Sequence, residues 1–287
     1  MVADGLVASA ARLTTSAARV GRDGALAVRF ERRDARSVLA GCRWTTPLQV
    51  MAPVALDDHA AVVSILNPTG GLVGGDRLAI DVTVSADAHA CLTTPSATKV
   101  YRTAGAVSEQ TVRMTLAPGA RLEWVPDHTI PFAGAALCQR FDAQVGDGAT
   151  LLIVDAFAAG RVARGELWRF ALLDSTLSVR DASGWLLHDR LRLRDGAPAS
   201  GLGLAEARPY VATIALIADA GVAAFADDVT ALADDDAAVG AALLPRRGAL
   251  VRCLAADAPA LSRMVDAVWA AARRHALGLP PLALRKP

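Results

Sequence analysis

The sequence has little lysine, cysteine or aromatic content. Only two of its 30 basic residues are lysines, Lys99 and Lys286, and aromatic residues make up 5% of the 287 positions. The formal net charge is +1, and no basic block is interleaved with aromatic residues, so a nucleic-acid partner is disfavoured. The four cysteines are widely spaced and form no C-x-x-C pair: Cys42, Cys91, Cys138 and Cys253. This spacing argues against a zinc site and predicts reduced thiols in a cytoplasmic protein.

The sequence also lacks a secretory signal and a membrane-spanning run. Residues 1–20 have neither a basic start nor a continuous apolar core. The longest uncharged apolar candidate, residues 60–75, contains Asn67, Pro68 and four glycines. We therefore expect no membrane association. Hydrophobic residues nevertheless make up 53% of the chain, which indicates surfaces that partner proteins cover.

Local signatures of catalysis are missing. The sequence contains no G-x-S-x-G and no H-E-x-x-H motif. Three His–Asp neighbours occur, at His59, His128 and His188, but adjacent strand residues point to opposite faces, so none is a preformed metal site. One enzymatic alternative remains open, a polysaccharide-active β-solenoid with paired carboxylates. Its candidate acids are Asp76, Asp81, Asp155 and Glu166.

The most distinctive stretch is the glycine-rich segment 67–76, Asn-Pro-Thr-Gly-Gly-Leu-Val-Gly-Gly-Asp. Its glycines, Gly70, Gly71, Gly74 and Gly75, predict a crowded corner where the backbone needs positive φ or a close approach. A phosphate-binding loop is excluded, because Asp and Arg follow the last glycine where Lys and Ser or Thr are required. The Rossmann spacing is absent too.

Short alternating runs dominate the sequence from residue 25 to residue 194. Strands are predicted at 25–31, at 60–66, at 78–84 and at 151–157, with turn residues roughly every 8 to 12 positions. Residues 37–56 contain two prolines and are predicted to form irregular or edge strands. The pattern is typical of a mainly β sandwich, barrel or solenoid, although no repeat of fixed period is visible.

Two helices are predicted near the C-terminus. Residues 222–232 keep a three-to-four spacing of apolar side chains, and residues 257–277 form the stronger pattern. In the second helix Asp257 is the expected cap, Pro259 lies in the first turn, and Gly278 ends the helix. We expect its apolar stripe to pack on the β core, with a partner-binding face as the alternative. Residues 1–24 are expected to be poorly ordered, and 220–278 to form the helical part of a single domain spanning 1–287.

Four further segments, in order along the chain, carry a family resemblance: 91–103, 122–126, 130–132 and 160–166. Together with the glycine corner they resemble the UreD (UreH) family of urease accessory proteins. The resemblance implies an irregular β-helical stack with a few helices and no catalysis of its own. It also implies apo-urease, UreF and the GTPase UreG as partners in nickel insertion.

The same resemblance implies no tightly bound cofactor, with nickel only in transit through an internal passage. Buried acids would stabilise such an ion, and the predicted positions are Asp76, Asp155 and Glu166, since each interrupts apolar or glycine-rich sequence. The alternative is that these acids accept backbone hydrogen bonds or pair with arginine, as Glu166 would with Arg161. The remaining family positions are predicted to be partner contacts or structural: the four corner glycines, Lys99, Tyr101, Arg102, Gly160, Arg161 and Gly165.

Overall fold

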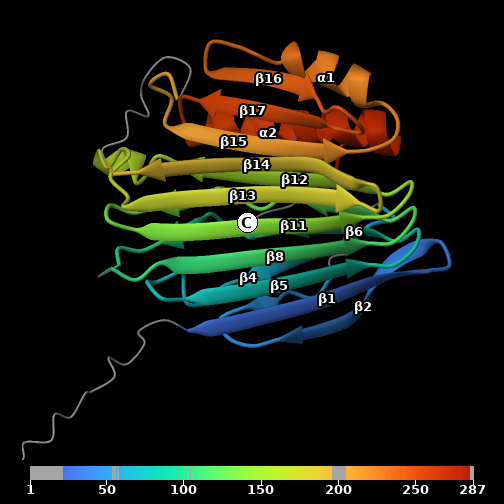
Figure 1. The fold of residues 1–287 in the computed structure, drawn as a ribbon, viewed down its shortest axis with the longest axis horizontal. Helices are drawn as coiled ribbons and strands as arrows, with labels where there is room; N and C mark the ends of the chain where they lie inside the picture. The colour runs from blue at the N-terminus through green and yellow to red at the C-terminus, as the bar shows by residue number, and fades with distance from the viewer. Residues whose placement is uncertain (1–21, 54–55, 57, 104, 196–204, 285–287) are drawn as a thin grey trace, which may run out of the picture.

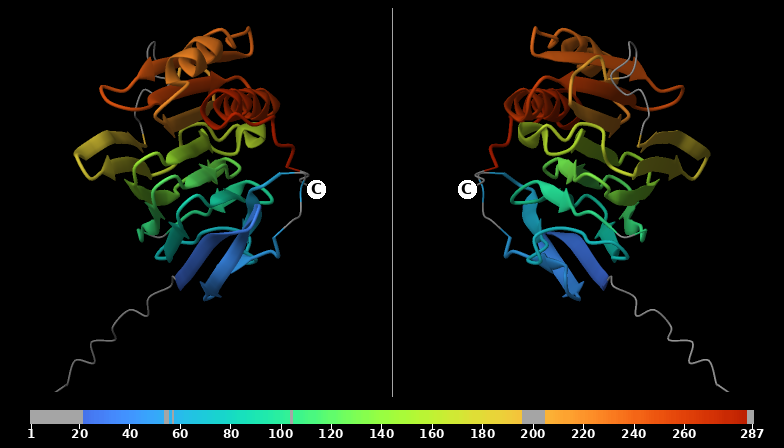
Figure 2. Two further views of the ribbon diagram at one scale, coloured as in Figure 1. Left: turned by 90° about the vertical axis from the view of Figure 1, so that its right-hand side faces the viewer. Right: turned by 90° about the vertical axis from the view of Figure 1, so that its left-hand side faces the viewer.

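A computed structural model describes residues 22–284, apart from 54, 55, 57, 104 and 196–204. Two stacked β-sheets form the body of the molecule (Figure 1), and helices cover part of one of them (Figure 2). The fold class predicted from the sequence is confirmed as a β-solenoid of about 4 turns with two helices near the C-terminus. Within the described residues no helix is long and apolar enough to cross a membrane.

The first sheet has seven strands in the order β14-β13-β11-β8-β5-β1-β2. Its five central strands run parallel, and the hairpins β1–β2 and β13–β14 make the two edges antiparallel. The strands are β1 (Asp23–Arg33), β2 (Arg36–Trp44), β5 (Arg77–Val84), β8 (Ser108–Leu116), β11 (Ala136–Val145), β13 (Leu172–Asp181) and β14 (Gly184–Arg194).

The second sheet follows the order β16-β17-β15-β12-β9-β6-β4-β3, and the short strands β10 and β7 continue sideways from β12. Strands β4, β6, β9 and β12 are parallel, whereas β15, β17 and β16 are added antiparallel. The strands are β3 (Gln49–Val50), β4 (Ala61–Leu66), β6 (His89–Thr93), β7 (Thr98–Val100), β9 (Arg121–Trp124), β10 (Thr129–Pro131), β12 (Thr150–Ala158), β15 (Tyr210–Ile217), β16 (Ala237–Leu243) and β17 (Ala249–Ala255).

Successive coils of the solenoid stack in register although their lengths differ. One row of the first sheet runs through Asp23, Arg77, Glu109, Cys138 and Asp174, so the chain advances by 54, 32, 29 and 36 residues between neighbours. Backbone hydrogen bonds and side-chain alternation fix the stacking, and neither needs coils of equal length. This irregularity explains why no repeat period is visible in the sequence.

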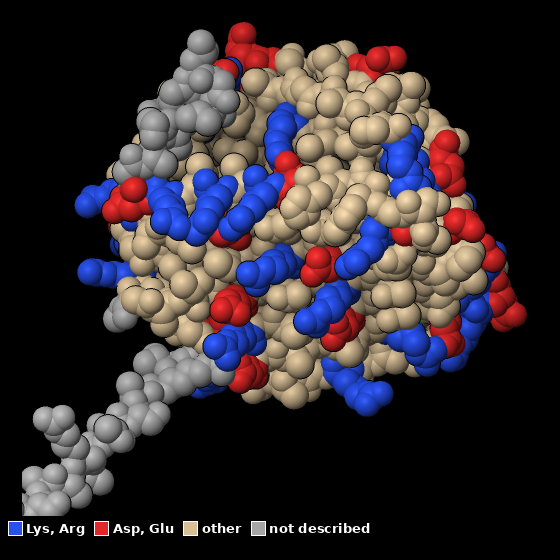
Figure 3. Space-filling view, in the orientation of Figure 1, with Lys and Arg blue, Asp and Glu red and all other residues tan. Residues whose placement is uncertain are grey.

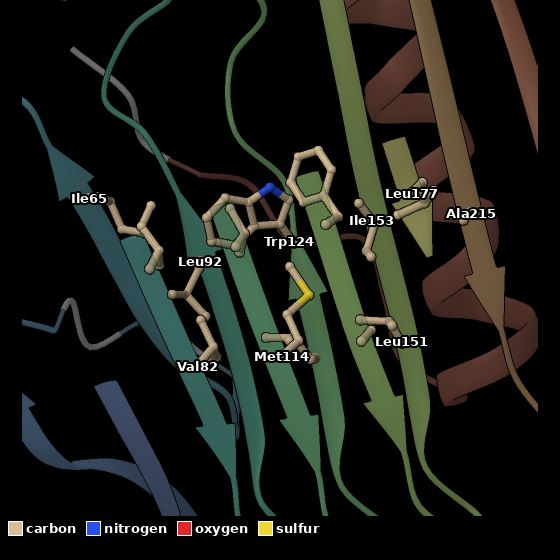
Figure 4. Close-up of a cluster of buried hydrophobic side chains, with 14 of the residues drawn as sticks. Ile65, Val82, Leu92, Met114, Trp124, Leu151, Ile153, Leu177 and Ala215 are labelled. Carbon is tan, nitrogen blue, oxygen red and sulfur yellow. The ribbon is translucent and has the colours of Figure 1, made fainter. Parts of the chain in front are cut away.

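The space between the two sheets is filled by the alternate side chains of each strand. Leu78, Ile80, Val82 and Val84 of β5 all point inward and are at most 3% exposed, as their alternation predicts. These four side chains belong to the same buried cluster as Leu92, Met114, Trp124, Leu151 and Ile153. Figure 4 shows Val82 of β5 within this cluster. The predicted strands at 25–31, 60–66 and 151–157 are confirmed as β1, β4 and β12. Residues 37–56 contain the edge strand β2 and the two-residue β3.

Two helices and a second apolar cluster cover the outer side of the second sheet. They are α1 (Val222–Thr230) and α2 (Ala258–Ala272), and α2 continues as a π-helical turn over Arg273–Leu277. Asp257 caps α2 as predicted, accepting a hydrogen bond from the Ala260 amide at 2.7 Å. The apolar stripe of α2 is buried against the sheet, so the packing interpretation is confirmed for that stripe. The predicted poorly ordered start of the chain lies almost wholly outside the described residues.

Candidate functional site

The segments that carry the family resemblance meet on one side of the solenoid. Leu72 of the glycine-rich segment forms a bridge with Val100 of β7, and β7 pairs with β10. The Leu72 amide donates to the Lys99 carbonyl at 2.8 Å, and the Tyr101 amide donates to the Leu72 carbonyl at 2.9 Å. Residues that lie far apart in the sequence thus form one corner of the coil.

The glycines of this corner are required by its geometry. Gly70, Gly71 and Gly75 have φ values of 84°, 148° and 87°. A Cβ on Gly71 would lie 2.3 Å from the Lys99 carbonyl oxygen, closer than non-bonded atoms approach. A Cβ on Gly74 would lie 2.5 Å from the Cβ of Thr103. The crowded corner predicted from the sequence is therefore present, and it brings two passes of backbone into contact.

A row of stacked side chains extends from the corner. The rings of Tyr101 and Phe132 meet edge to face with centroids 5.1 Å apart, and the Arg161 guanidinium lies 4.3 Å from the centre of the Phe132 ring. The Tyr101 hydroxyl donates to the Gly70 carbonyl at 3.3 Å. These contacts join positions near 70, 100, 130 and 160 into one cluster.

Glu166 completes this cluster through a bidentate ion pair. Arg161 Nε donates to Glu166 Oε2 at 2.8 Å, and the other carboxylate oxygen accepts from the terminal guanidinium nitrogen. The hydrogen bond from Arg161 lowers the pKa of Glu166, so this side chain is a carboxylate at neutral pH. Gly160, with φ of 140°, makes room for the loop, because a Cβ there would lie 2.1 Å from the Glu166 carbonyl oxygen. Gly165 adopts a left-handed φ of 70°.

The corner also exposes charged and apolar side chains. Lys99 and Arg102 are exposed, as are Val73 at 39% and Leu167 at 44%. We call this set, together with Tyr101, the corner surface. A mixture of exposed apolar and basic residues on a rigid base is typical of protein-binding surfaces.

Asp76, at the end of the glycine-rich segment, is buried and accepts hydrogen bonds from two backbone amides. Its Oδ1 accepts from the Arg22 amide at 2.8 Å, and its Oδ2 accepts from the Val73 amide at 2.9 Å. The side chain is 2% exposed. Both carboxylate oxygens therefore fix the start of β5 against the corner.

A small cavity of about 160 Å³, with both apolar and polar lining residues, lies next to the corner. Its walls include Gly70, Gly71 and Asp155, and hydrogen bonds connect Asp155 with two glutamines of the lining. Gln110 donates to Gln139 at 3.0 Å, and Gln139 donates to Asp155 Oδ1 at 2.9 Å. Ser175 donates to the second oxygen of Asp155 at 2.6 Å. The sequence reasoning identified Asp155 but not the two glutamines, which interrupt inward-facing apolar rows in the same way.

Burial raises the pKa of Asp155, and the hydrogen bonds from Ser175 and Gln139 oppose that shift. Trp124 adds a buried donor to the cavity wall, because its indole Nε1 has no hydrogen-bond partner among the described residues. The lining residues include no histidine and no cysteine. The cavity thus offers oxygen ligands only, and the described part of the chain contains no cluster of three or more metal-ligating side chains.

The other predicted acids and histidines lie elsewhere. Asp81 is exposed on the outer side of β5 and pairs with Arg113 at 3.3 Å. His188 shares a hydrogen bond with Ser178, and His128 packs edge to face on Tyr210. Of the four acids considered for paired-carboxylate chemistry, only Asp155 lines the cavity.

A buried ionic network was missed by the sequence reasoning. Glu123 of β9 is 1% exposed and interacts with His89, Arg273 and Trp269. Arg273, which is 0% exposed, also binds Asp58 and donates to the Pro280 carbonyl. In the sequence Arg273 is followed by two further basic residues, Arg274 and His275, near the C-terminal end of the helix. The sequence around Arg273 therefore does not indicate that its side chain is buried. Glu123 does give such a signal, because it lies between the apolar residues Leu122 and Trp124.

The fold and this site define a β-solenoid with a rigid glycine-rich corner next to an internal cavity. The family model described as "UreD urease accessory protein" matches residues 22–287. A UreD from Pseudomonas putida is 34% identical over 258 residues, covering 89% of this chain and 90% of that protein. A UreD from Klebsiella aerogenes is 34% identical over 263 residues, covering 91% and 95%. A second UreD of Streptomyces griseus is 33% identical over 274 residues, covering 92% and 94%.

The chain therefore belongs to the UreD family of urease accessory proteins. It is a urease maturation factor, a non-catalytic chaperone for assembly of the nickel metallocentre. Its family implies the urease apoprotein and other accessory proteins as partners. The alternative of a polysaccharide-active enzyme is wrong, since members of this family are not catalytic.

Proposed function

We propose that this protein joins apo-urease to UreF and the GTPase UreG, and that nickel passes through its interior past Asp155. The observation that carries the proposal is that Gly70 and Gly71 of the glycine corner, next to the residues of the corner surface, line the same cavity as Asp155. The sequence has no nucleotide-binding motif, so GTP hydrolysis belongs to the partner. A cytoplasmic location stays a prediction.

The corner surface supports the scaffold role. Its exposed residues stand on a backbone that three positive-φ glycines and the Arg161–Glu166 pair hold in one conformation. Because the corner surface already has a fixed conformation, it loses little conformational entropy when a partner binds, which favours affinity. Lys99 and Arg102 give the surface a positive charge, so we expect an acidic patch on the partner.

The cavity supports transit of a cation better than its storage. The lining offers the carboxylates of Asp127 and Asp155 and amide oxygens, which are weaker ligands for nickel than imidazole or thiolate, and it contains neither of the latter. An ion that moves through a protein has to bind weakly enough to leave. The cavity volume is enough for several water molecules, which can accompany a partly hydrated ion.

Among the three predicted nickel-passage acids, the geometry favours Asp155. Both oxygens of Asp155 also accept hydrogen bonds, but the donors are the neutral side chains of Gln139 and Ser175, and Asp155 lines the cavity. Asp76 uses both oxygens for backbone amides, and Glu166 uses both for Arg161. Releasing either carboxylate to an ion would break the corner. We therefore assign Asp76 and Glu166 to holding the corner and Asp155 to the passage.

Assembly of the complex tests the scaffold role. The protein is co-expressed with apo-urease, UreF and UreG, and recovery of each partner is measured by pull-down. The double variant Lys99→Glu with Arg102→Glu reverses the charge of the corner surface, and Arg43→Glu on the exposed end of β2 serves as the control. We expect the double variant to lose at least one partner and the control to retain all of them.

Two outcomes contradict the proposal. Full recovery of every partner with the double variant removes the corner surface as an interface. Absence of any complex with folded wild-type protein refutes the scaffold role as a whole. Circular dichroism of each purified variant separates lost binding from lost folding.

A further inference from the structure

The strand β16 forms one edge of the second sheet, next to α1. It lies at the opposite end of the molecule from β2 (Figure 1), where Figure 3 shows uncharged surface between two groups of acidic residues. Its seven residues, Ala-Ala-Val-Gly-Ala-Ala-Leu, include no charge and no proline. Leu243 at its end is 59% exposed. Natural sheet edges usually carry a charge, a proline or a bulge, because an open edge recruits other strands.

The outward hydrogen-bonding groups of β16 follow from its pairing with β17. The Ala256 amide donates a hydrogen bond to the Asp236 carbonyl, and the Leu244 amide donates to the Gly248 carbonyl. Because the direction of the backbone groups alternates along a strand, the even-numbered residues of β16 are the ones that form hydrogen bonds with β17. The N–H and C=O groups of Val239, Ala241 and Leu243 therefore point away from the sheet. No backbone partner for these groups occurs among the described residues.

The opposite edge of the molecule shows the usual protection. The edge strand β2 carries Arg36 and Arg43, and its register with β1 shifts between Arg29 and Phe30. These are the devices that discourage pairing with another chain. The edge strand β2 of the first sheet thus carries these devices, whereas β16 of the second sheet carries no charge and no proline, which points to a partner strand at β16.

We propose that β16 pairs antiparallel with β16 of a second copy of this chain. The two-fold axis of the pair passes between the two Ala241 residues, so that Val239 of each copy lies opposite Leu243 of the other. In this register the outward N–H and C=O groups of Val239, Ala241 and Leu243 all find hydrogen-bond partners. Pro245, which has no N–H, then lies opposite Ala237, whose carbonyl is already occupied by the Asp234 amide. The pairing therefore stops at positions where neither strand has a free hydrogen-bonding group.

Charge at the ends of the strand supports the antiparallel direction. Three aspartates, residues 234–236, precede β16, and Arg246 and Arg247 follow it. Within each chain Asp236 already pairs with Arg263, and Arg246 with Asp181. In the proposed register Asp236 of one copy also lies opposite Arg246 of the other, whereas parallel pairing would place like charges together. The small side chains add no obstacle at the centre, since a Cβ on Gly240 would meet no atom within 4 Å.

Disulfide trapping and the oligomeric state test this interface. In a Cys42→Ser, Cys138→Ser background, Ala241→Cys brings two thiols opposite each other, with Cα atoms about 5.5 Å apart, within the disulfide range. We expect covalent dimers on mild oxidation. The matched control restores Cys42 alone, an exposed cysteine on the protected edge β2, which should stay monomeric.

Light scattering of the purified protein gives the second measurement. The variant Ala241→Pro removes an N–H that points outward, so it should weaken self-association about tenfold or more while leaving the β17 pairing intact. Leu243→Lys, on an exposed position, should act in the same direction without affecting folding.

The proposal is overturned if folded wild-type protein is monomeric at all accessible concentrations and Ala241→Cys does not cross-link. It is also overturned if the protein is monomeric alone but Ala241→Pro abolishes binding of another protein, since the edge then takes a strand from that partner. Dimerisation that both edge variants weaken, with selective cross-linking at position 241, supports it.

Discussion

Arg273, at the end of α2, donates a hydrogen bond to Glu123 of β9 across 2.6 Å, and both side chains are almost completely buried. This pair joins the C-terminal helix to the solenoid, since the two residues are 150 positions apart in the sequence. His89 and Trp269 also bind Glu123, and Asp58 binds Arg273. The pair is therefore the centre of a network that fixes α2 on the sheet.

Removing Arg273 should strongly destabilise the protein. Arg273→Met leaves Glu123 and Asp58 buried without their cation, and such a change typically costs about 3–5 kcal/mol in the free energy of unfolding. The neighbouring Arg274→Met removes an exposed pair with Asp228 and should cost about 0–1 kcal/mol. Urea denaturation measures both. Equal, small losses would show that the network does not hold the helix.

The corner should reject a side chain at Gly71. Gly71→Ala combines a positive φ with a Cβ 2.3 Å from the Lys99 carbonyl oxygen. We expect a loss of about 2–4 kcal/mol, from strain and from overpacking together. Gly165→Ala has a positive φ but no atom within 4 Å of the new Cβ, so about 1 kcal/mol is expected there. Similar thermal shifts for the two variants would contradict the close contact at Gly71.

Glu166 should stabilise the fold only while it is ionised. Its pKa is lowered in the folded protein by Arg161, so its contribution is present above the unfolded value of about 4.3 and is lost as the pH falls through the folded pKa. Glu166→Gln should therefore be less stable than the wild type at pH 7 and equal to it in strong acid. Unfolding free energies across that range check this, and a constant difference would refute it.

Asp155 should show the opposite pH dependence. Burial raises its pKa in the folded protein, so its contribution to stability is greatest below the unfolded value of about 3.9 and falls as the pH rises through the folded pKa. Asp155→Asn should accordingly gain stability relative to the wild type as the pH rises. The same pH series measures it, and an increasing loss of stability with rising pH would show that the ionised form is the one the fold favours.

Much of the fold could be predicted because alternation is a local signal. The strand β5 and its buried face follow directly from residues 78–84, and α2 follows from its cap and its apolar stripe. The coils have unequal lengths, so the stacking of Arg77 on Glu109 could not be derived from a repeat. The prediction of a solenoid rather than a sandwich or a barrel came from the resemblance to the family.

The candidate site was predictable only in part, because its contacts join distant segments. The Arg161–Glu166 pair spans five positions and was foreseen as one alternative. The contacts of Gln139 with Asp155, and of Arg273 with Glu123, join residues from separate coils or from the terminal helix. The sequence shows where a polar residue interrupts a run of inward-facing apolar positions, but it does not show which side chain that residue contacts in the fold.

Nickel-dependent activation of urease tests the central claim most directly. Wild-type protein, Asp155→Asn and the control Asp81→Asn are each assembled with apo-urease, UreF and UreG, and urease activity is measured after adding nickel, bicarbonate and GTP. Both substitutions remove one carboxylate, but only Asp155 lines the cavity, whereas Asp81 is exposed on the outer face. The account predicts intact assembly for all three and a several-fold lower activation with Asp155→Asn alone. Equal activation by all three complexes would contradict the passage of nickel past Asp155.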